Sequence, residues 1–487
     1  MSTSLIIAVI IGYFLTLFVI SYFTSRNSNN DTFFIGNRKS PWYLVSIAMI
    51  GTSISGVTFI SVPGWVLTSQ FSYLQMVLGY LLGYVVVANV LLPLYYRLNL
   101  KSIYTYLESR FGFYSYKTGA FLFLVSRIIG SAFRLFIVSN VLQLSIFNAL
   151  GVPFWITVSI TVILIWLYTR KGGVRTVLWT DSFQAVAMLT AVSLCVYYIS
   201  SDLNLSFSGI VKTVSNSPLS RIWFFDDPNQ RFYFWKQFLG GAFITIVMTG
   251  LDQDMMQKNL SCRNYKDARK NMYWYGFAFL PVNLLFLSLG VLLHTFAVQK
   301  GIPLPAQSDD LFPTLATQGY LPQIVGVLFF LGLIAAAYSS ADSALTALTT
   351  SFTIDVLNTK AMDEDKLRRV RQWVHVFISV LMILVIILFN AFNDRSVIDA
   401  IFTIAGYTYG PLLGLYAFGL FTRFQVNDKL VPFIAIFSPI ACYFLNKYSA
   451  ILFGGYRFGF ELLIVNGAIV FLLLLITRKR GVVVERV

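Results

Sequence analysis

Apolar segments long enough to cross a lipid bilayer recur along almost the whole chain. A transmembrane helix needs about 20 mostly apolar residues, and only 12% of the 487 residues are charged, whereas soluble domains average about 25%. The apolar runs predict about thirteen spans, near residues 5–24, 42–70, 73–94, 118–150, 154–168, 177–199, 238–256, 273–297, 321–353, 373–392, 397–420, 430–444 and 458–476. We therefore expect an all-α integral membrane protein with little room for a soluble domain.

The basic residues indicate how the chain is oriented. With the N-terminus outside, most of the 36 Lys and Arg residues fall in cytoplasmic loops, as the positive-inside rule requires. The net charge of +15 is then explained by orientation and by anionic lipid, and no nucleic-acid partner is expected. The first span lacks a basic n-region and a cleavage site, so it is expected to be retained. These features predict a multi-pass protein of the cell (inner) membrane with a cytoplasmic C-terminus.

Enzymatic chemistry has little support in the sequence. The three cysteines have no paired spacing, and the two histidines, His294 and His375, lie far apart. Neither a metal knuckle nor a hydrolase-type arrangement is therefore indicated, and we predict no catalytic residue. No obligatory protein partner is implied.

A cluster of oxygen-bearing side chains interrupts the apolar segment 321–353. Ala336, Ser339, Ser340 and Ser343 fall on one helical face, and Asp342 lies beside them. Polar groups at membrane depth are costly and usually face a cavity or an ion pathway. Hydroxyl, carboxylate and carbonyl oxygens suit a hard cation. Close helix packing by small residues is the alternative explanation.

Two spans are expected to be broken. The second span carries Gly51 and Gly56 among several Ser and Thr residues, and the span beginning at Phe238 carries Gly240-Gly241 and Gly250. The two lie five spans apart. Interrupted helices at corresponding positions of two halves indicate a transporter built from inverted repeats, with its binding site between the two breaks.

Charged residues inside the spans provide further candidates. Arg134 lies at the midpoint of its span, where it is suited either to hold a carboxylate of a bound solute or to pair with an internal acid such as Asp342 or with backbone carbonyls. Arg127 is expected to reach the cytoplasmic surface. Asp252 and Asp254 are expected to form a solvated ion pair with Lys258.

Seven motifs carry a family resemblance. They are Phe34-Ile35-Gly36-Asn37-Arg38, Ser55-Gly56 with Pro63-Gly64, Ser102-Ile103-Tyr104-Thr105 with Arg110-Phe111-Gly112, Gly172-Gly173-Val174-Arg175 with Thr180-Asp181 and Gln184, Asp252-Gln253 with Gln257, Ala336-x-x-Ser339-Ser340, and Gly410-Pro411-Leu412-Leu413-Gly414. In this order the chain resembles the sodium/solute symporter family, which contains sodium/glucose, sodium/proline and bacterial sodium/sialic acid transporters.

The resemblance implies a LeuT-like fold with a 5+5 inverted-repeat core whose first and sixth core helices are broken. The core is expected over residues 31–425. An extra N-terminal helix would occupy residues 1–30, and two further helices with a short basic cytoplasmic tail would occupy residues 426–487.

The resemblance also implies sodium sites. The first would use backbone carbonyls of Gly51, Ile54 and Ala336 with the hydroxyls of Ser339 and Ser340. Some members hold a second sodium, for which Asp181, Ser339, Asp342 and Ser343 are the matching residues. Those members tend to have a hydroxyl where this chain has Asp342. This carboxylate could instead bind a proton or pair with Arg134, so the choice between one and two sodium ions stays open.

The expected substrate is a small polar solute. Ser53, Ser55, Thr58, Gln75 and Arg134 most resemble the binding residues of the sialic acid branch, which implies sodium-coupled symport of a sialic acid or a related carboxylate-bearing sugar into the cell. The alternatives are symport of a monocarboxylate, a neutral sugar or an amino acid, and sodium-independent uniport on the same fold.

Overall fold

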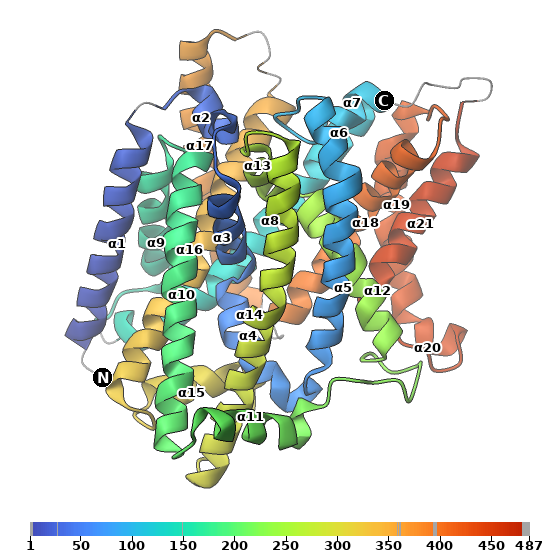
Figure 1. The fold of residues 1–487 in the computed structure, drawn as a ribbon. Coiled ribbons are helices and arrows are strands. Elements are labelled where there is room, and N and C mark those ends of the chain that lie inside the picture. The colour runs from blue at the N-terminus through green and yellow to red at the C-terminus, as the bar shows by residue number, and fades with distance from the viewer. Residues whose placement is uncertain are drawn as a thin grey trace.

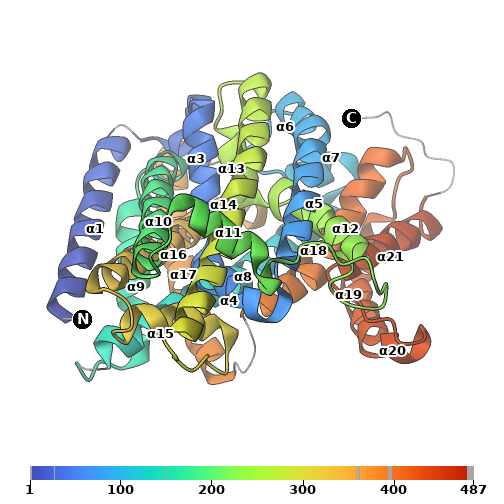
Figure 2. The ribbon, with the colours of Figure 1, turned by 60° about the horizontal axis from the view of Figure 1, so that its bottom comes forward.

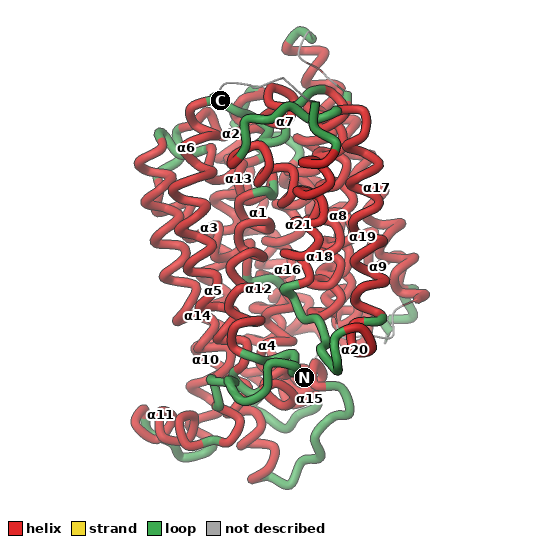
Figure 3. Tube along the Cα trace, turned by 90° about the vertical axis from the view of Figure 1, so that its right-hand side faces the viewer, coloured by secondary structure: helices red, strands yellow, loops and turns green. Residues whose placement is uncertain are grey.

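The computed structural model describes residues 3–26, 28–148, 150–357, 359, 362–392 and 397–479. Within these ranges the regular elements are helices joined by loops, and an isolated β-bridge pairs Ser40 with Cys262. Figure 3 shows the helices side by side, with the loops gathered at the two ends of the bundle. The expected basic C-terminal tail falls mainly on 480–487, outside the described residues.

The α-helices are α1 (Thr3–Ser25), α2 (Asn30–Ile35), α3 (Trp42–Ser53), α4 (Gly56–Ser69), α5 (Ser72–Val86), α6 (Leu92–Arg97), α7 (Thr105–Arg110), α8 (Phe113–Leu142), α9 (Phe154–Thr169), α10 (Val174–Asp202), α11 (Phe207–Asn216), α12 (Phe234–Thr245), α13 (Gln253–Leu260), α14 (Tyr265–Gln299), α15 (Leu311–Thr317), α16 (Gln323–Ser351), α17 (Glu364–Phe392), α18 (Val397–Phe421), α19 (Val431–Lys447), α20 (Ser449–Leu452) and α21 (Leu462–Ile476). Short 3₁₀ segments are η1 (Gly36–Arg38), η4 (Pro218–Ser220), η6 (Ser308–Asp310) and η9 (Asp428–Leu430), and π segments are η2 (Val87–Leu91), η3 (Gln143–Phe147), η5 (Ile246–Gly250) and η7 (Phe352–Val356).

Every predicted span contains a helix. Not all of these helices are long enough for the expected total of about thirteen full crossings. Among the described residues, eight helices are long and apolar enough to cross a membrane, and up to ten if each bent pair counts as one span. Two further apolar helices, Phe154–Thr169 and Leu462–Ile476, are shorter. The protein is a multi-pass membrane protein.

Both predicted helix breaks are confirmed. The axes of α3 and α4 meet at 60°, and those of the Phe234–Gly250 segment and α13 at 63°. At the first bend Ile54 (φ −88°, ψ 87°) and Ser55 (φ −81°, ψ 172°) leave the helical conformation. At the second bend the extended Asp252 caps α13, because its Oδ1 accepts hydrogen bonds from the backbone N–H groups of Asp254 and Met255.

The helix α16 is the most buried of the eight described helices that are long and apolar enough to cross a membrane. In its most apolar stretch 83% of the residues are buried, and it contacts α3, α4, α8 and α10. The flanking helix α1 lies at one edge of the molecule and α19 to α21 lie at the other (Figures 1 and 2). The two bends and α16 therefore sit in the interior, between these outer helices.

Candidate binding site at the two helix bends

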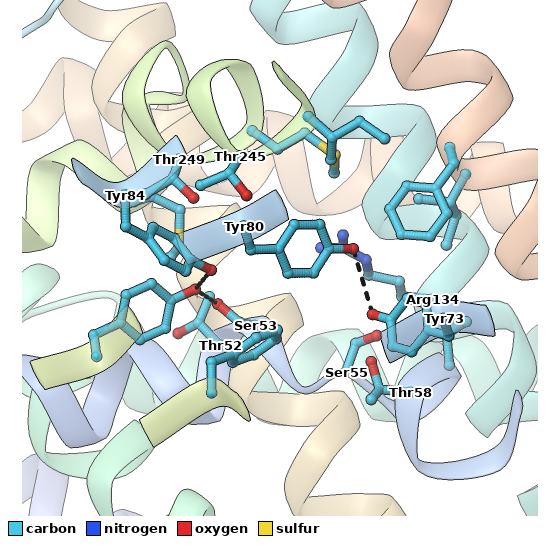
Figure 4. Close-up of a pocket in the computed structure, with 18 of the residues that line it drawn as sticks. Thr52, Ser53, Ser55, Thr58, Tyr73, Tyr80, Tyr84, Arg134, Thr245 and Thr249 are labelled. Carbon is cyan, nitrogen blue, oxygen red and sulfur yellow. Dashed lines mark hydrogen bonds between the residues drawn. The ribbon is translucent and has the colours of Figure 1, made fainter. Parts of the chain in front are cut away.

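A cavity of about 110 Å³, lined by hydroxyl groups, two arginines and apolar side chains, lies between the two bent helices. One water molecule needs about 10–15 Å³ of cavity volume measured in this way. The cavity could therefore hold several waters, and it has room for a small organic solute. Helices α3, α4, α5, α8, α12, α13, α14 and α18, together with η5, supply its wall (Figure 4). Its lining residues are Thr52, Ser53, Ser55, Val57, Thr58, Tyr73, Tyr80, Tyr84, Arg127, Arg134, Ile244, Thr245, Met248, Thr249, Met255, Tyr275, Phe279, Ile401 and Phe402.

Four of the five predicted solute-binding residues line this cavity: Ser53, Ser55, Thr58 and Arg134. The fifth, Gln75, does not. Its amide NH₂ donates to the Phe232 carbonyl (3.0 Å), and its amide oxygen accepts from the Phe224 N–H (3.2 Å). Gln75 is fully buried and holds the loop before α12, so the structure does not bring it to the cavity.

Tyrosines form a large part of the wall, and the sequence prediction missed them. Tyr73, Tyr80 and Tyr84 follow one another at spacings of seven and four residues, which places them on one face of α5. The hydroxyl of Tyr84 donates to that of Tyr275 across 3.0 Å, and Tyr275 shares a hydrogen bond of 2.5 Å with Ser53 (Figure 4). This chain of hydroxyls links α5 and α14 to the first bend.

Arg134 reaches the cavity without a carboxylate partner. Its Nη1 donates to Ser340 Oγ at 3.2 Å, and its Nε has no hydrogen-bond partner in the described part of the chain. No described carboxylate lies within 4.0 Å of its guanidinium, and Asp342 instead accepts from Tyr168 and Thr180 (2.8 and 3.3 Å). The internal Arg134–Asp342 pair considered from the sequence is therefore absent among these residues.

Two of the residues predicted for the first sodium site, Gly51 and Ser339, lie in close contact, and a third, Ser340, bonds to Arg134 of the cavity wall. The Ile54 N–H donates to the Ile50 carbonyl (3.0 Å). Because α3 ends there, the carbonyls from Gly51 onward lack the N–H donors that a further helical turn would provide. A side chain at Gly51 would place its Cβ 2.7 Å from the Asp181 carbonyl oxygen and 3.1 Å from Ser339 Oγ. Glycine therefore allows α3, α10 and α16 to meet at Gly51, Asp181 and Ser339.

The second predicted set is only partly brought together. Asp181 accepts hydrogen bonds from Ser339 (2.7 Å), Ser343 (2.8 Å) and Thr52 (2.8 Å). Asp342 directs one oxygen to Tyr168 and Thr180, and its Oδ1 accepts no hydrogen bond from a described residue. Lys258 occupies the centre of this cluster, with its Nζ 2.6 Å from Asp181 Oδ2.

Four charged residues expected near water are in fact buried: Arg127, Asp252, Asp254 and Lys258. Arg127 pairs with Asp254 and lies 3.7 Å from Asp252, whose Oδ2 also accepts from Tyr409. Lys258 lies 3.8 Å from Asp254 and 2.6 Å from Asp181. The prediction of a solvated ion pair and of a surface-reaching Arg127 was wrong, because the bend after Gly250 turns α13 back into the bundle.

A membrane bundle that is helical over its described elements, with a cavity between two bent helices, is characteristic of secondary transporters with inverted repeats. The model of the Sodium:solute symporter family matches residues 33–429, and the chain belongs to this family. It is 26% identical over 415 residues to the human sodium/iodide cotransporter, covering 80% of this chain and 61% of that protein. It is 24% identical over 435 residues to the sodium/sialic acid symporter NanT of Aliivibrio fischeri, covering 86% and 83%.

A solved structure has the same fold. A Na⁺-coupled sialic acid symporter in a substrate-bound, outward-open state superposes with a TM-score of 0.83 at 21% identity, over 99% of both chains. The LeuT-like fold expected from the sequence is thereby confirmed.

Proposed function

We propose that this protein is a sodium-coupled symporter that carries a sialic acid, or a related carboxylate-bearing sugar, into the cell by alternating access. Arg134 is the observation that carries this proposal. An arginine at membrane depth is costly unless it is paired, and this one faces the solute cavity without a described carboxylate. A planar guanidinium holds a carboxylate in two parallel hydrogen bonds.

The hydroxyls around Arg134 suit the rest of a sugar acid. Ser53, Ser55 and Thr58 at the first bend, with Tyr73 and Tyr80 on α5, offer donors and acceptors around the same cavity. A neutral hexose would leave the guanidinium unpaired. A small monocarboxylate would pair with it but would leave many of these hydroxyls without partners, which costs binding energy.

Sodium is assigned to Gly51, Ile54, Ala336, Ser339 and Ser340. An ion there would join the first bend to α16 and favour the conformation that binds solute, since an ion shifts a conformational equilibrium only by its different affinity for the two states. Ser340 also accepts from Arg134, so this site and the solute cavity share a direct contact. The proposed orientation in the inner membrane has the N-terminus outside and the C-terminus in the cytoplasm, supported by the positive-inside distribution.

The test is uptake of labelled N-acetylneuraminate into proteoliposomes under an inward sodium gradient, with a matched potassium gradient as control. We expect accumulation with sodium alone. Equal uptake with both cations would contradict sodium coupling and support uniport. No uptake under either gradient, together with sodium-driven uptake of a monocarboxylate, neutral sugar or amino acid, would contradict the sialic acid assignment and retain the symporter.

A further inference from the structure

The side chain of Lys258, on the helix that follows the second bend, is buried in the protein interior. It belongs to α13 and has a side-chain exposure of 2%. Its Nζ lies 2.6 Å from Asp181 Oδ2 on α10 and 2.6 Å from Ser343 Oγ on α16, and it also contacts Thr52 Oγ1 on α3. One ammonium group therefore connects four helices.

The ammonium uses the oxygens that a second sodium would need. A lysine ammonium has three N–H donors, and three oxygen acceptors surround this one. Asp181 and Ser343 are two of the four residues predicted for the second sodium site. A sodium ion and the ammonium, both monovalent cations, cannot bind the same Asp181 and Ser343 oxygens at once.

The other two predicted ligands, Ser339 and Asp342, make their hydrogen bonds to described residues other than Lys258. Ser339 gives its hydrogen bond to Asp181 Oδ1 at 2.7 Å and belongs to the first sodium site. Asp342 accepts its hydrogen bonds from Tyr168 and Thr180 through Oδ2, and its Oδ1 accepts none from a described residue.

Neighbouring charges hold Lys258 in place. Asp254, one helical turn earlier on α13, lies 3.8 Å from Nζ and is itself paired with Arg127. The ammonium thus lies between Asp181 and Asp254, with Arg127 beyond, in a row of alternating charge. Withdrawing Lys258 would leave Asp181 buried without a cation, and a buried unpaired charge is strongly unfavourable.

We infer that Lys258 is the resident cation of the second cation site, so that one sodium ion, bound at the first site, accompanies each solute. This inference rests on the proposed function and specifies its stoichiometry. One sodium with a monoanion moves no net charge, so the membrane potential does not drive uptake. A tenfold sodium gradient then supports only about tenfold accumulation, because the two concentration ratios balance.

The test counts bound sodium without any solute. Equilibrium binding of ²²Na⁺ to the purified full-length protein is expected to saturate at one ion per molecule, with a non-cooperative isotherm. Lys258→Met, which removes the ammonium and retains the side-chain volume, should bind two. Lys258→Arg, which retains a cation, should bind one.

Each result separates this inference from the proposed function. Two ions on the parent protein would overturn the role of Lys258 while leaving sodium symport intact, as would one ion on both the parent and a folded Lys258→Met protein. No sodium bound by the parent would contradict sodium coupling itself. If Lys258→Met does not fold, Lys258→Gln serves as the second neutral variant, and the parent count still decides between one ion and two.

Discussion

Arg134 and Ser340 are joined by a hydrogen bond of 3.2 Å between Nη1 and Oγ. The first residue faces the solute cavity, and the second is a predicted sodium ligand. A sodium ion at Ser340 would coordinate the same oxygen that accepts from Arg134, so we expect the guanidinium to shift when the proposed ion binds. This contact provides a short physical route for coupling between ion and solute.

Replacing Arg134 with alanine should abolish uptake of a carboxylate-bearing solute while sodium binding persists. Hydrogen bonds to charged groups contribute about 1.5–3 kcal/mol, which corresponds to a loss of affinity of roughly 10- to 150-fold. Solute binding by calorimetry and ²²Na⁺ binding measure the two effects separately. Arg134→Lys is the matched control, because it keeps the charge and removes the planar fork, and it should lie between the parent and Arg134→Ala. Uptake by Arg134→Ala at the parent level would show that this arginine is structural.

The hydroxyl of Ser339 should be needed for sodium. Ser339→Ala removes a predicted ligand and the hydrogen bond to Asp181, so half-maximal uptake should require at least about tenfold more sodium, as the loss of about 1.4 kcal/mol implies. Thr346→Val is the matched control on α16, because the Thr346 hydroxyl has no hydrogen-bond partner in the described structure. Uptake as a function of sodium concentration is the measurement. The same sodium requirement in Ser339→Ala and the parent would remove the assigned ion site.

The bends and the small-residue face of α16 could be predicted from sequence because their causes are local. Gly and Ser residues weaken a helix whatever its surroundings in the fold. Residues at positions i, i+3, i+4 and i+7 share one face by helical geometry alone. The convergence of Gly51 with Ser339 could be anticipated only through the family resemblance, because the two residues lie far apart in the chain.

The errors involve residues whose environment depends on the tertiary fold. Gln75 is two residues from Tyr73, so the two side chains leave α5 about 200° apart; Tyr73 faces the cavity, while Gln75 faces the 224–232 loop. The spacing of Lys258 and Asp254 is that of a surface ion pair on a helix. Lys258 is turned toward Asp181 by the 63° bend before α13. The direction of that bend cannot be predicted from the sequence.

Arg127 should be essential for stability. Its guanidinium neutralises two buried carboxylates, Asp252 and Asp254, and removing one partner of a buried ion pair costs about 3–5 kcal/mol. Arg127→Ala should therefore unfold at a clearly lower temperature in detergent than the parent. Arg127→Ala combined with Asp254→Ala should recover part of this loss, because one of the stranded charges is gone. Equal unfolding temperatures for the parent and Arg127→Ala would contradict a structural role for this pair.

Gly51 should tolerate no side chain, although it lies inside a helix where alanine is ordinarily favoured by about 1 kcal/mol. A Cβ at this position would lie 2.7 Å from the backbone oxygen of Asp181 and 3.1 Å from Ser339 Oγ, and a backbone oxygen cannot rotate away as a side chain can. Gly51→Ala should push α3 away from α10 and α16. We expect a clear loss of ²²Na⁺ affinity and only a small drop in the unfolding temperature. Gly130→Ala is the matched control, because a Cβ there meets nothing within 4 Å and should leave sodium binding unchanged. Parent-like sodium affinity in Gly51→Ala would show that the ion does not depend on the close approach of these three helices.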